Sequence, residues 1–264
     1  MRSQVTEENS NNVKSVLKAF LIMEELDKGG ELSIGDLSER LSMDKATVHR
    51  LINTIKEAGY ANQNLDNKKY SNSLKLLAMG NRVMEKTGVK HISRVYMETL
   101  SAQSGETINL GVCVGNKIIY IDKLESTSTI KVGLGIGTSV PIYCSGLGKA
   151  ILAFIPEKDV KSMLDTIAFE KFTNHTIVDR EELIDSLREI RKAGYSVDDE
   201  EYVEGLICIG APIFDYHGLP VAAITISCPK YRYNVEKHLT LFSGLVIDAA
   251  QKISKQLGYK KRVK

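Results

Sequence analysis

The sequence contains no tryptophan, only five prolines and no long apolar run. A helix that spans a bilayer needs about 18 or more consecutive apolar residues, and no segment here approaches that length. The N-terminal stretch MRSQVTEENSNN is polar and lacks the apolar core of a secretory signal peptide. The sequence therefore predicts a cytoplasmic protein without a membrane partner.

Cysteine is scarce and widely spaced. The four cysteines form no CxxC motif or Cys/His ligand spacing, and the five histidines show no metal or catalytic-triad pattern. In a cytoplasmic protein, cysteines so far apart indicate reduced thiols rather than disulfides. We expect no disulfide, no metal site and no cofactor.

The chain also has no large excess of either positive or negative charge, since its net charge is only +2. Residues 1–72 hold ten Lys/Arg and eleven Asp/Glu, a net charge of −1. The basic residues that matter lie within residues 45–69, whereas most acids precede them. If this part binds nucleic acid, its phosphate contacts are therefore few. The 264 residues suffice for two ordinary domains.

Residues 32–60 carry the pattern of a helix-turn-helix. Ser33 is a suitable N-cap for a first helix, and Ser42 to Asp44 break the pattern before a second. Asp44 or Ser42 is expected to cap the second helix, which ends at Gly59. Its apolar face consists of Val48, Leu51, Ile52 and Ile55.

The other face of this second helix has the side chains of a major-groove reader, namely short polar groups and long cations near the helix start. The candidate DNA-binding residues on it are Lys45, Ala46, Thr47, His49, Arg50 and Asn53. The segment YANQNLDNKKYS that follows predicts a hairpin with its tip at Asn64 to Asn67, which is typical of a wing. Lys68 and Lys69 on that wing are expected to contact phosphates. A helical hairpin without a DNA-binding role is the alternative.

Two further helices are expected around this unit. Residues 12–29 predict an amphipathic helix that supports the helix-turn-helix, capped by Asn11 or Asn12 and ended by Gly29–Gly30. Its apolar pattern comprises Val13, Val16, Leu17, Phe20, Leu21, Met23 and Leu26. We place the DNA-binding domain at residues 12–72 and a linker helix at residues 73–91.

The periodicity changes from Thr107 onward. Three β-rich runs at 107–115, 117–125 and 129–137 precede helical patterns at 145–154, 157–167 and 179–195, the last capped by Asp179 and closed by Gly194. A loop or edge strand at 195–205, a hairpin turning at 216–219 and a helix at 235–257 complete the chain. The class is α+β, with an antiparallel sheet flanked by helices in a domain at residues 92–259.

The segment VPIYCSGLGKAILAF is the most informative for chemistry in this domain. Gly146 and Gly148 lie where a loop enters a helix, which favours binding of a carboxylate or phosphate by free N–H groups. A tight turn without a ligand is the alternative. Residues 198–201, DDEE, are either paired acids at a site or a solvated acidic loop.

The order of these elements and several strings resemble the IclR family of bacterial transcription regulators over nearly the full length. The matching strings are DKATVHRLINTIKEAGY, YSNSLKLLAMG, SGLGKAILA, GYSVDDEEYVEGLICIGAPIF and AAITIS. The resemblance implies a winged helix-turn-helix, a linker helix and a GAF-like effector-binding domain. It also implies a homodimer or homotetramer that binds a pseudo-palindromic DNA operator.

The same resemblance implies an effector, usually a small carboxylate, held by backbone N–H groups and a few polar side chains. The matching polar positions are Gly146, Leu147, Asp198, Cys208, Thr225 and Ser227, and the apolar lining would be Val132, Val140 and Leu206. Thr225 replaces the usual Ser, and Ile207 stands where an Arg often precedes the Cys.

Together these features predict a DNA-binding regulator, a repressor controlled by a 2-keto acid, and no enzyme. ETINLGVCVGNKIIYIDKLES is most similar to the 2-keto-3-deoxygluconate repressors within the family. The alternatives are an activator that responds to glyoxylate, pyruvate or an aromatic acid, and a keto-acid enzyme with Cys208 as nucleophile and Asp198 as acid.

Overall fold

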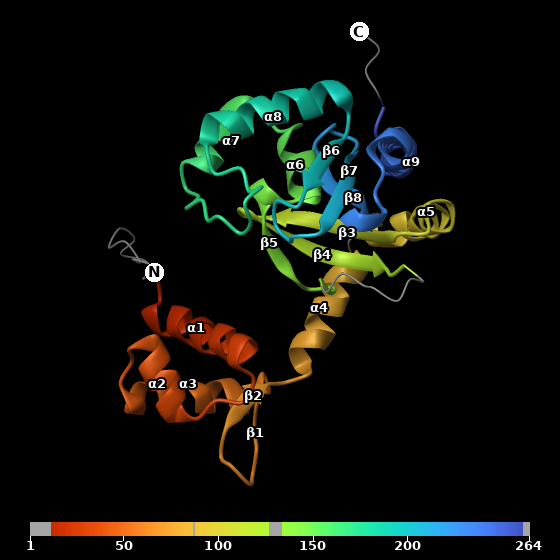
Figure 1. Ribbon diagram of the computed structural model, residues 1–264. Helices are drawn as coiled ribbons and strands as arrows, with labels where there is room; N and C mark the ends of the chain where they lie inside the picture. Colours follow the sequence, from red (N-terminus) through yellow and green to blue (C-terminus); the bar gives the residue numbers. More distant parts are fainter. Residues whose placement is uncertain (1–11, 87, 127–133, 261–264) are drawn as a thin grey trace. The chain divides into compact units, whose positions relative to one another are not determined.

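The computed structural model describes residues 12–86, 88–126 and 134–260, and the chain divides into two compact units, residues 1–84 and 85–264. The first unit contains three helices and a two-stranded antiparallel hairpin (Figure 1). Its elements are α1 (Lys14–Gly29), α2 (Ile34–Leu41), α3 (Lys45–Glu57), β1 (Ala61–Gln63), β2 (Tyr70–Asn72) and the start of α4 (Lys75–Lys86).

The core of this unit lies where α1, α2 and α3 meet the hairpin. Its buried side chains are Ile22, Leu26, Leu32, Leu37, Val48, Ile52, Ile55, Ala61 and Tyr70. The predicted caps of α2 and α3 are confirmed, because Ser33 and Asp44 accept hydrogen bonds from the first turns of these helices. The helix-turn-helix and its wing are therefore present as predicted.

Two expectations for α1 are wrong. Its N-cap is Val13, without a side-chain hydrogen bond, instead of Asn11 or Asn12. The predicted supporting face is also only partly buried: Leu26 is in the core, but the apolar residues of the first two turns are exposed. These exposed residues are Val13, Val16, Leu17, Phe20 and Leu21. The helix carries a second apolar stripe that is left exposed by the described residues of its own unit.

The second unit is built on a six-stranded sheet in the order β5-β4-β3-β8-β7-β6, in which every neighbouring pair is antiparallel. Its elements are α5 (Gly88–Ser104), β3 (Thr107–Val114), β4 (Lys117–Leu124), β5 (Ser139–Pro141), α6 (Gly146–Leu152), α7 (Glu157–Leu164), α8 (Arg180–Ala193), β6 (Ser196–Asp199), β7 (Leu206–Phe214), β8 (Pro220–Pro229) and α9 (Val235–Gln256).

Helices cover both faces of this sheet (Figure 1). Helices α5 and α9 pack together against one face, and α6 packs against β7 and β8 from the other, with α8 outside it. The predicted cap at Asp179, the closure at Gly194 and the edge position of β6 are confirmed. The α+β class with an antiparallel sheet flanked by helices is confirmed as well.

The third predicted strand, at 129–137, is not found as such. Residues 129–133 lie outside the described residues, and residues 135–138 form a turn, closed by a hydrogen bond from the N–H of Thr138 to the carbonyl of Gly135, in which Gly137 has a φ of +88°. The short strand β5 follows this turn instead. No helix in the described part of the chain is long and apolar enough to cross a membrane.

Candidate functional site

Local hydrogen bonds fix the angle at which α3 leaves the turn. Asp44 accepts a 2.8 Å hydrogen bond from the backbone N–H of Thr47, and this bond lowers the pKa of the Asp44 carboxyl. Ser42 adopts a left-handed conformation, with φ +52°, and the Ser38 hydroxyl donates to the carbonyl of Met43 at 2.6 Å. The start of α3, where the candidate DNA-binding side chains lie, is therefore held firmly.

These side chains form one outward surface. Lys45, Ala46, His49 and Arg50 are exposed, and Thr47 and Asn53 are half-buried beside them. The Asn53 side-chain amide lies 3.2 Å from Nε2 of His49. No ion pair engages the Arg50 guanidinium within the described residues, so its fork of N–H donors faces outward.

The wing is fixed by an acid that the sequence did not single out. Glu31 accepts hydrogen bonds from Asn64 at 3.1 Å and from Asn67 at 2.8 Å, at the tip of the hairpin. Lys68 beside this tip is exposed, with φ +58°, and Lys69 is half-buried. Glu31 is more than thirty residues from the wing in sequence, so no local pattern could have revealed this contact.

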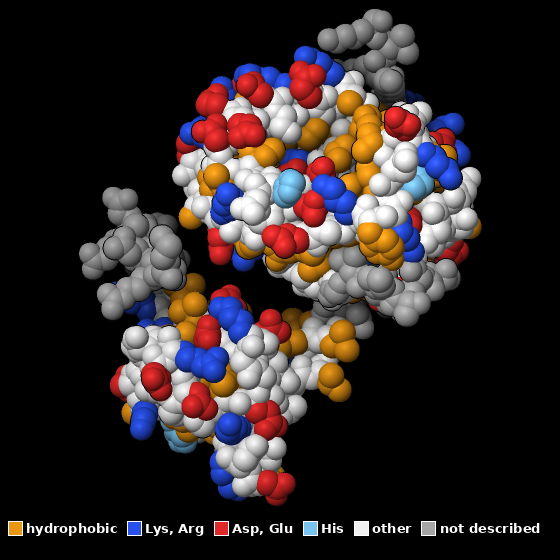
Figure 2. All heavy atoms as spheres, viewed as in Figure 1, with side chains coloured by type: hydrophobic (Ala, Val, Ile, Leu, Met, Phe, Trp, Pro, Cys, Tyr) orange, Lys and Arg blue, Asp and Glu red, His pale blue; other side chains and the backbone are white. Residues whose placement is uncertain are grey.

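Charge over the first unit is mixed. On the face shown in Figure 2, basic and acidic side chains alternate instead of forming one basic patch. This agrees with the net charge of −1 over residues 1–72. Binding to DNA is therefore supported by the geometry of α3 and the wing rather than by an excess of positive charge.

In the second unit, strand register brings together the predicted effector residues. Asp198 on β6 is the cross-strand partner of Cys208 on β7, and Cys208 is the partner of Ser227 on β8. Thr225 lies on the same face of the sheet, two residues before Ser227 on β8. The start of α6 covers them: a methyl group at Gly146 would lie 3.1 Å from Cβ of Cys208.

The apolar positions are only partly placed by the structure. Leu147 and Val140 are buried in the core that α6 shares with β4 and β5. Leu206 is buried on the same face of β7 as Cys208, two residues earlier. Val132, the remaining predicted lining residue, lies outside the described residues.

Asp198 already binds the N–H group that the sequence assigned to an anion. Its carboxylate accepts from the backbone N–H of Gly146 at 3.3 Å and from that of Glu201 at 2.9 Å. Burial, reinforced by the charge of Glu201, raises the pKa of Asp198 to about 7. The N–H of Gly148 also has a partner, because it donates a 3.1 Å hydrogen bond to the Ser145 hydroxyl oxygen. The prediction of free N–H groups at Gly146 and Gly148 is therefore wrong for this conformation.

A buried ion pair lies beneath this cluster. Lys149 of α6 is 2% exposed and donates to the Glu201 carboxylate and, at 2.7 Å, to the carbonyl of Val197. The interpretation of residues 198–201 as a solvated loop is therefore wrong for Asp198 and Glu201, both 5% exposed. A single cation inside the apolar segment GLGKAILAF was the signal that could have predicted this pair.

Cys208 does not have the environment of a nucleophile. Burial, and then the neighbouring Asp198 charge, raise the pKa of its thiol well above the ordinary value. Reactive cysteines are instead thiolates in electropositive, partly exposed sites. The Ser227 hydroxyl donates to Sγ of Cys208 at 3.1 Å, so the thiol serves as a weak hydrogen-bond acceptor.

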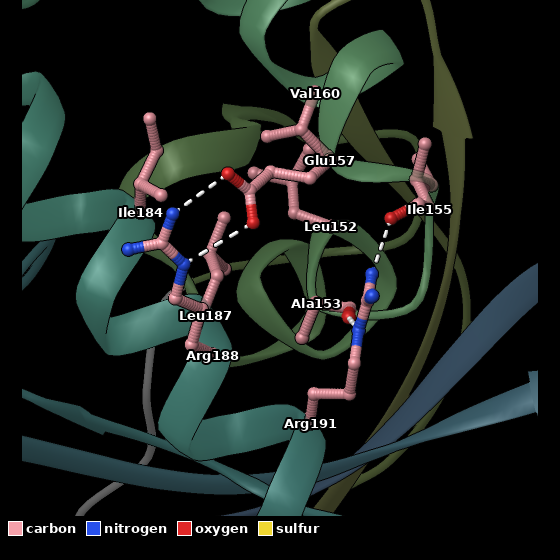
Figure 3. A pocket seen from close by; sticks show the side chains of 9 residues that line it. All are labelled: Leu152, Ala153, Ile155, Glu157, Val160, Ile184, Leu187, Arg188 and Arg191. Atoms are coloured by element: carbon pink, nitrogen blue, oxygen red, sulfur yellow. Dashed lines mark hydrogen bonds and ion pairs between the residues drawn. The ribbon is translucent and has the colours of Figure 1, made fainter.

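The cluster is closed in this conformation, since Asp198, Cys208, Thr225 and Ser227 are each 6% exposed or less. A small hollow of about 30 Å³ lies between α6, α7 and α8, where Arg188 pairs with Glu157 and Arg191 caps the carbonyls of Ala153 and Ile155 (Figure 3). That volume holds roughly one water molecule. A larger hollow of about 990 Å³ lies between the ends of α8 and α9. Neither hollow is lined by a predicted effector residue, so the candidate site is defined by its convergent polar groups.

Comparison with known proteins gives a consistent result over both units. The family model described as "Bacterial transcriptional regulator IclR C-terminal" matches residues 81–255, and "IclR helix-turn-helix domain" matches residues 15–65. The HTH-type transcriptional regulator KdgR of Escherichia coli strain K12 is 36% identical over 249 residues, covering 94% of each chain.

Two further relatives agree with this. The HTH-type transcriptional repressor AllR of Escherichia coli strain K12 is 32% identical, covering 92% of this chain and 90% of its own. The crystal structure of the Thermotoga maritima IclR superposes with a TM-score of 0.73 at 32% identity, over 94% of this chain and 100% of that one.

Proposed function

This chain belongs to the IclR family of bacterial transcriptional regulators, and we propose that it is a repressor released from its operator by a 2-keto sugar acid. Its relatives are transcriptional regulators, so the chain is a regulator and not an enzyme. Repression is favoured over activation by a relative named as a repressor. Because the protein acts on DNA, we expect it in the cytoplasm, without a membrane partner.

On the DNA side, the exposed surface of α3 enters the major groove and the wing contacts adjacent phosphates. Lys45, Ala46, Thr47, His49, Arg50 and Asn53 face the bases, and Lys68 and Lys69 face the backbone. Two subunits read half-sites of a pseudo-palindrome about one helical turn, or a multiple of it, apart. The uncovered apolar stripe of α1, with Phe20 56% exposed, supports assembly into a homodimer or homotetramer.

On the effector side, one observation carries the proposal: Asp198, Cys208, Thr225 and Ser227 converge under the start of α6. The ligand's carboxylate takes over the N–H groups of Gly146 and Leu147, with Val132, Val140 and Leu206 as apolar neighbours. We take 2-keto-3-deoxygluconate as the effector; glyoxylate, pyruvate and an aromatic acid are the alternatives, for a repressor or an activator.

Because the cluster is closed, the effector has to displace Asp198 from Gly146 and move α6 relative to β6 and β7. This movement is the means by which binding in the second unit changes DNA affinity. Couplings of this kind are commonly about 1–3 kcal/mol, or about 5- to 150-fold in affinity.

Fluorescence anisotropy on the upstream intergenic DNA at fixed salt tests the proposal. We expect tight, sequence-specific binding that 2-keto-3-deoxygluconate weakens. If this compound has no effect but glyoxylate, pyruvate or an aromatic acid weakens DNA binding, the protein is still a regulator but its effector is one of those acids. Binding strengthened by the effector would indicate an activator.

A further inference from the structure

We propose that Asn109 of β3 determines effector specificity by accepting a hydrogen bond from an effector hydroxyl group remote from the carboxylate, an inference that rests on the proposed function. The effector is then an acid that carries hydroxyl groups, rather than glyoxylate or pyruvate, which carry none. No sequence motif had singled Asn109 out.

Strand register places Asn109 in the same polar layer as the effector cluster. Asn109 is the cross-strand partner of Thr225, and cross-strand partners point to the same face of a sheet. Its side-chain amide donates to the Ser227 hydroxyl at 3.0 Å, and Ser227 in turn donates to Cys208. A chain of hydrogen bonds therefore joins Asn109 to the other members of the cluster.

Within this series of hydrogen bonds, one side-chain atom lacks a hydrogen-bond partner. Asn109 is only 5% exposed, and its Oδ1 makes no hydrogen bond within the described residues. A buried acceptor without a donor is unfavourable, and native proteins rarely retain one without a reason. The Ser227 hydroxyl is already engaged with Cys208, so it does not donate to this oxygen, and a hydroxyl of the ligand is the donor that we propose.

A second acceptor near the cluster has the same deficit. Oε2 of Glu201 is buried without a partner among the described residues, while its Oε1 binds Lys149. Both unmatched groups are acceptors, so a ligand that carries several hydroxyl donors fits this site better than an alkyl chain, which offers none.

Asn109 also lies close to the start of α6. A methyl group at Gly146 would lie 3.5 Å from Cγ2 of Thr225, which is the cross-strand partner of Asn109. A single ligand can therefore place its carboxylate at Gly146 and a hydroxyl at Asn109. Glyoxylate and pyruvate carry no hydroxyl for the second contact.

The surroundings of Asn109 are polar, as a hydroxylated tail requires. A bulge between Leu110 and Gly111 in the pairing of β3 with β4 places Lys123 opposite Asn109. The Lys123 side chain is 9% exposed and lies 3.5 Å from the Glu125 carboxylate. An unsubstituted alkyl tail would be buried against these groups without any compensating hydrogen bond.

The test is calorimetric titration of the full-length protein with two acids that share six carbons, the carboxylate and the 2-keto group. 2-Keto-3-deoxygluconate carries hydroxyls along the rest of the chain, and 2-oxohexanoate carries none. We expect wild type to prefer the hydroxylated acid at least 30-fold. Asn109→Leu, nearly the same size but without the acceptor, should reduce this preference about tenfold by weakening only the hydroxylated acid. If the leucine variant does not fold, Asn109→Ala is used for the same comparison.

Ser93→Ala is the matched control, because Ser93 Oγ is also buried and unpaired in the described residues but lies on α5, over the opposite face of the sheet. It should leave the preference unchanged. An unchanged preference in both Asn109 variants, or an equal loss in Ser93→Ala, overturns the role of Asn109 while the effector site stands. Failure of wild type to bind either acid overturns the proposed effector class and this inference with it.

Discussion

At the scale of single residues, we propose that Arg50 serves DNA binding and Asp198 serves effector binding. Arg50 is exposed on α3 beside a turn that hydrogen bonds hold in place, and Asp198 is buried under α6 and bound to two backbone N–H groups. The exposed Arg50 side chain is accessible to a partner outside the molecule, whereas Asp198 is accessible only if α6 moves.

Removal of the Arg50 side chain should weaken operator binding about 10- to 100-fold, which corresponds to the roughly 1–3 kcal/mol that a good base contact contributes. Anisotropy titrations of Arg50→Ala on specific and scrambled DNA measure this loss, which should be confined to the specific sequence. The control is Lys28→Ala, which removes one cation that is 67% exposed and paired with Glu25 on α1. Equal losses in the two variants would show that only net charge matters.

Effector affinity should fall as pH rises through about 7. Burial raises the pKa of Asp198 to about 7, so the carboxyl is mostly protonated at pH 6 and mostly ionised at pH 8. An incoming carboxylate is repelled by the ionised form, and binding therefore takes up a proton. Linkage then gives a loss of up to about tenfold per pH unit above the pKa.

Titration calorimetry at pH 6, 7 and 8, in buffers of different ionisation enthalpy, measures both the affinity and the proton uptake. Asp198→Asn keeps the shape of the side chain but cannot ionise, so its affinity should be independent of pH over this range. The facing groups Glu201, Lys149, Cys208 and Tyr120 are the same in both proteins. A pH dependence that persists in Asp198→Asn assigns the effect to one of them.

At the scale of secondary-structure elements, α6 depends on an unusually close approach of its backbone to the preceding turn. A methyl group at Gly148 would lie 1.9 Å from the carbonyl oxygen of Ile142. Gly148→Ala therefore forces α6 away from this turn, and we expect a loss of at least about 3 kcal/mol, the upper end for overpacking. Thermal unfolding followed by circular dichroism checks this.

Gly244 in α9 is the matched control for that substitution. It is also a helical glycine of the second unit, but a methyl group added there would have no neighbouring atom within 4 Å. Gly244→Ala should stabilise the protein by about 0.5–1 kcal/mol through the lower entropy of the unfolded chain. Similar melting temperatures for the two variants would show that the space around Gly148 relaxes without cost.

Elements that local signals define could be predicted from the sequence. Helix α8 begins after Asp179 and ends at Gly194 as expected, because capping is decided by neighbouring residues. The face of α1 could not be predicted, because apolar residues lie on both sides of it. Ile22, absent from the predicted pattern, is fully buried, whereas Phe20 is exposed.

The chemistry of the second unit depended more on the resemblance to a family than on patterns in the chain. Asp198, Cys208 and Ser227 meet through the register of three strands, which no local periodicity specifies. The pairing of Lys149 with Glu201 likewise joins residues about fifty positions apart. Asn109 was missed because its side chain acquires a role only when β3 pairs with β8.

At the scale of the whole molecule, the two units communicate only if effector and operator favour different conformations of the same protein. Such coupling is reciprocal: a ligand that weakens DNA binding by a given factor is itself bound more weakly, by that factor, when DNA is present. The proposed displacement of Asp198 from Gly146 therefore has a consequence that can be measured at the effector site without following DNA release.

We expect saturating operator DNA to weaken the binding of 2-keto-3-deoxygluconate by the same factor, within about 5- to 150-fold, by which this acid weakens operator binding. Calorimetric titration with and without DNA gives one factor, and anisotropy with and without the acid gives the other. In Arg50→Ala, which should no longer bind the operator tightly, the same DNA concentration should leave the effector affinity nearly unchanged. At equilibrium the two factors must be equal. If DNA left the effector affinity of wild type unchanged as well, the fall in anisotropy caused by the acid would not come from coupling between the two sites.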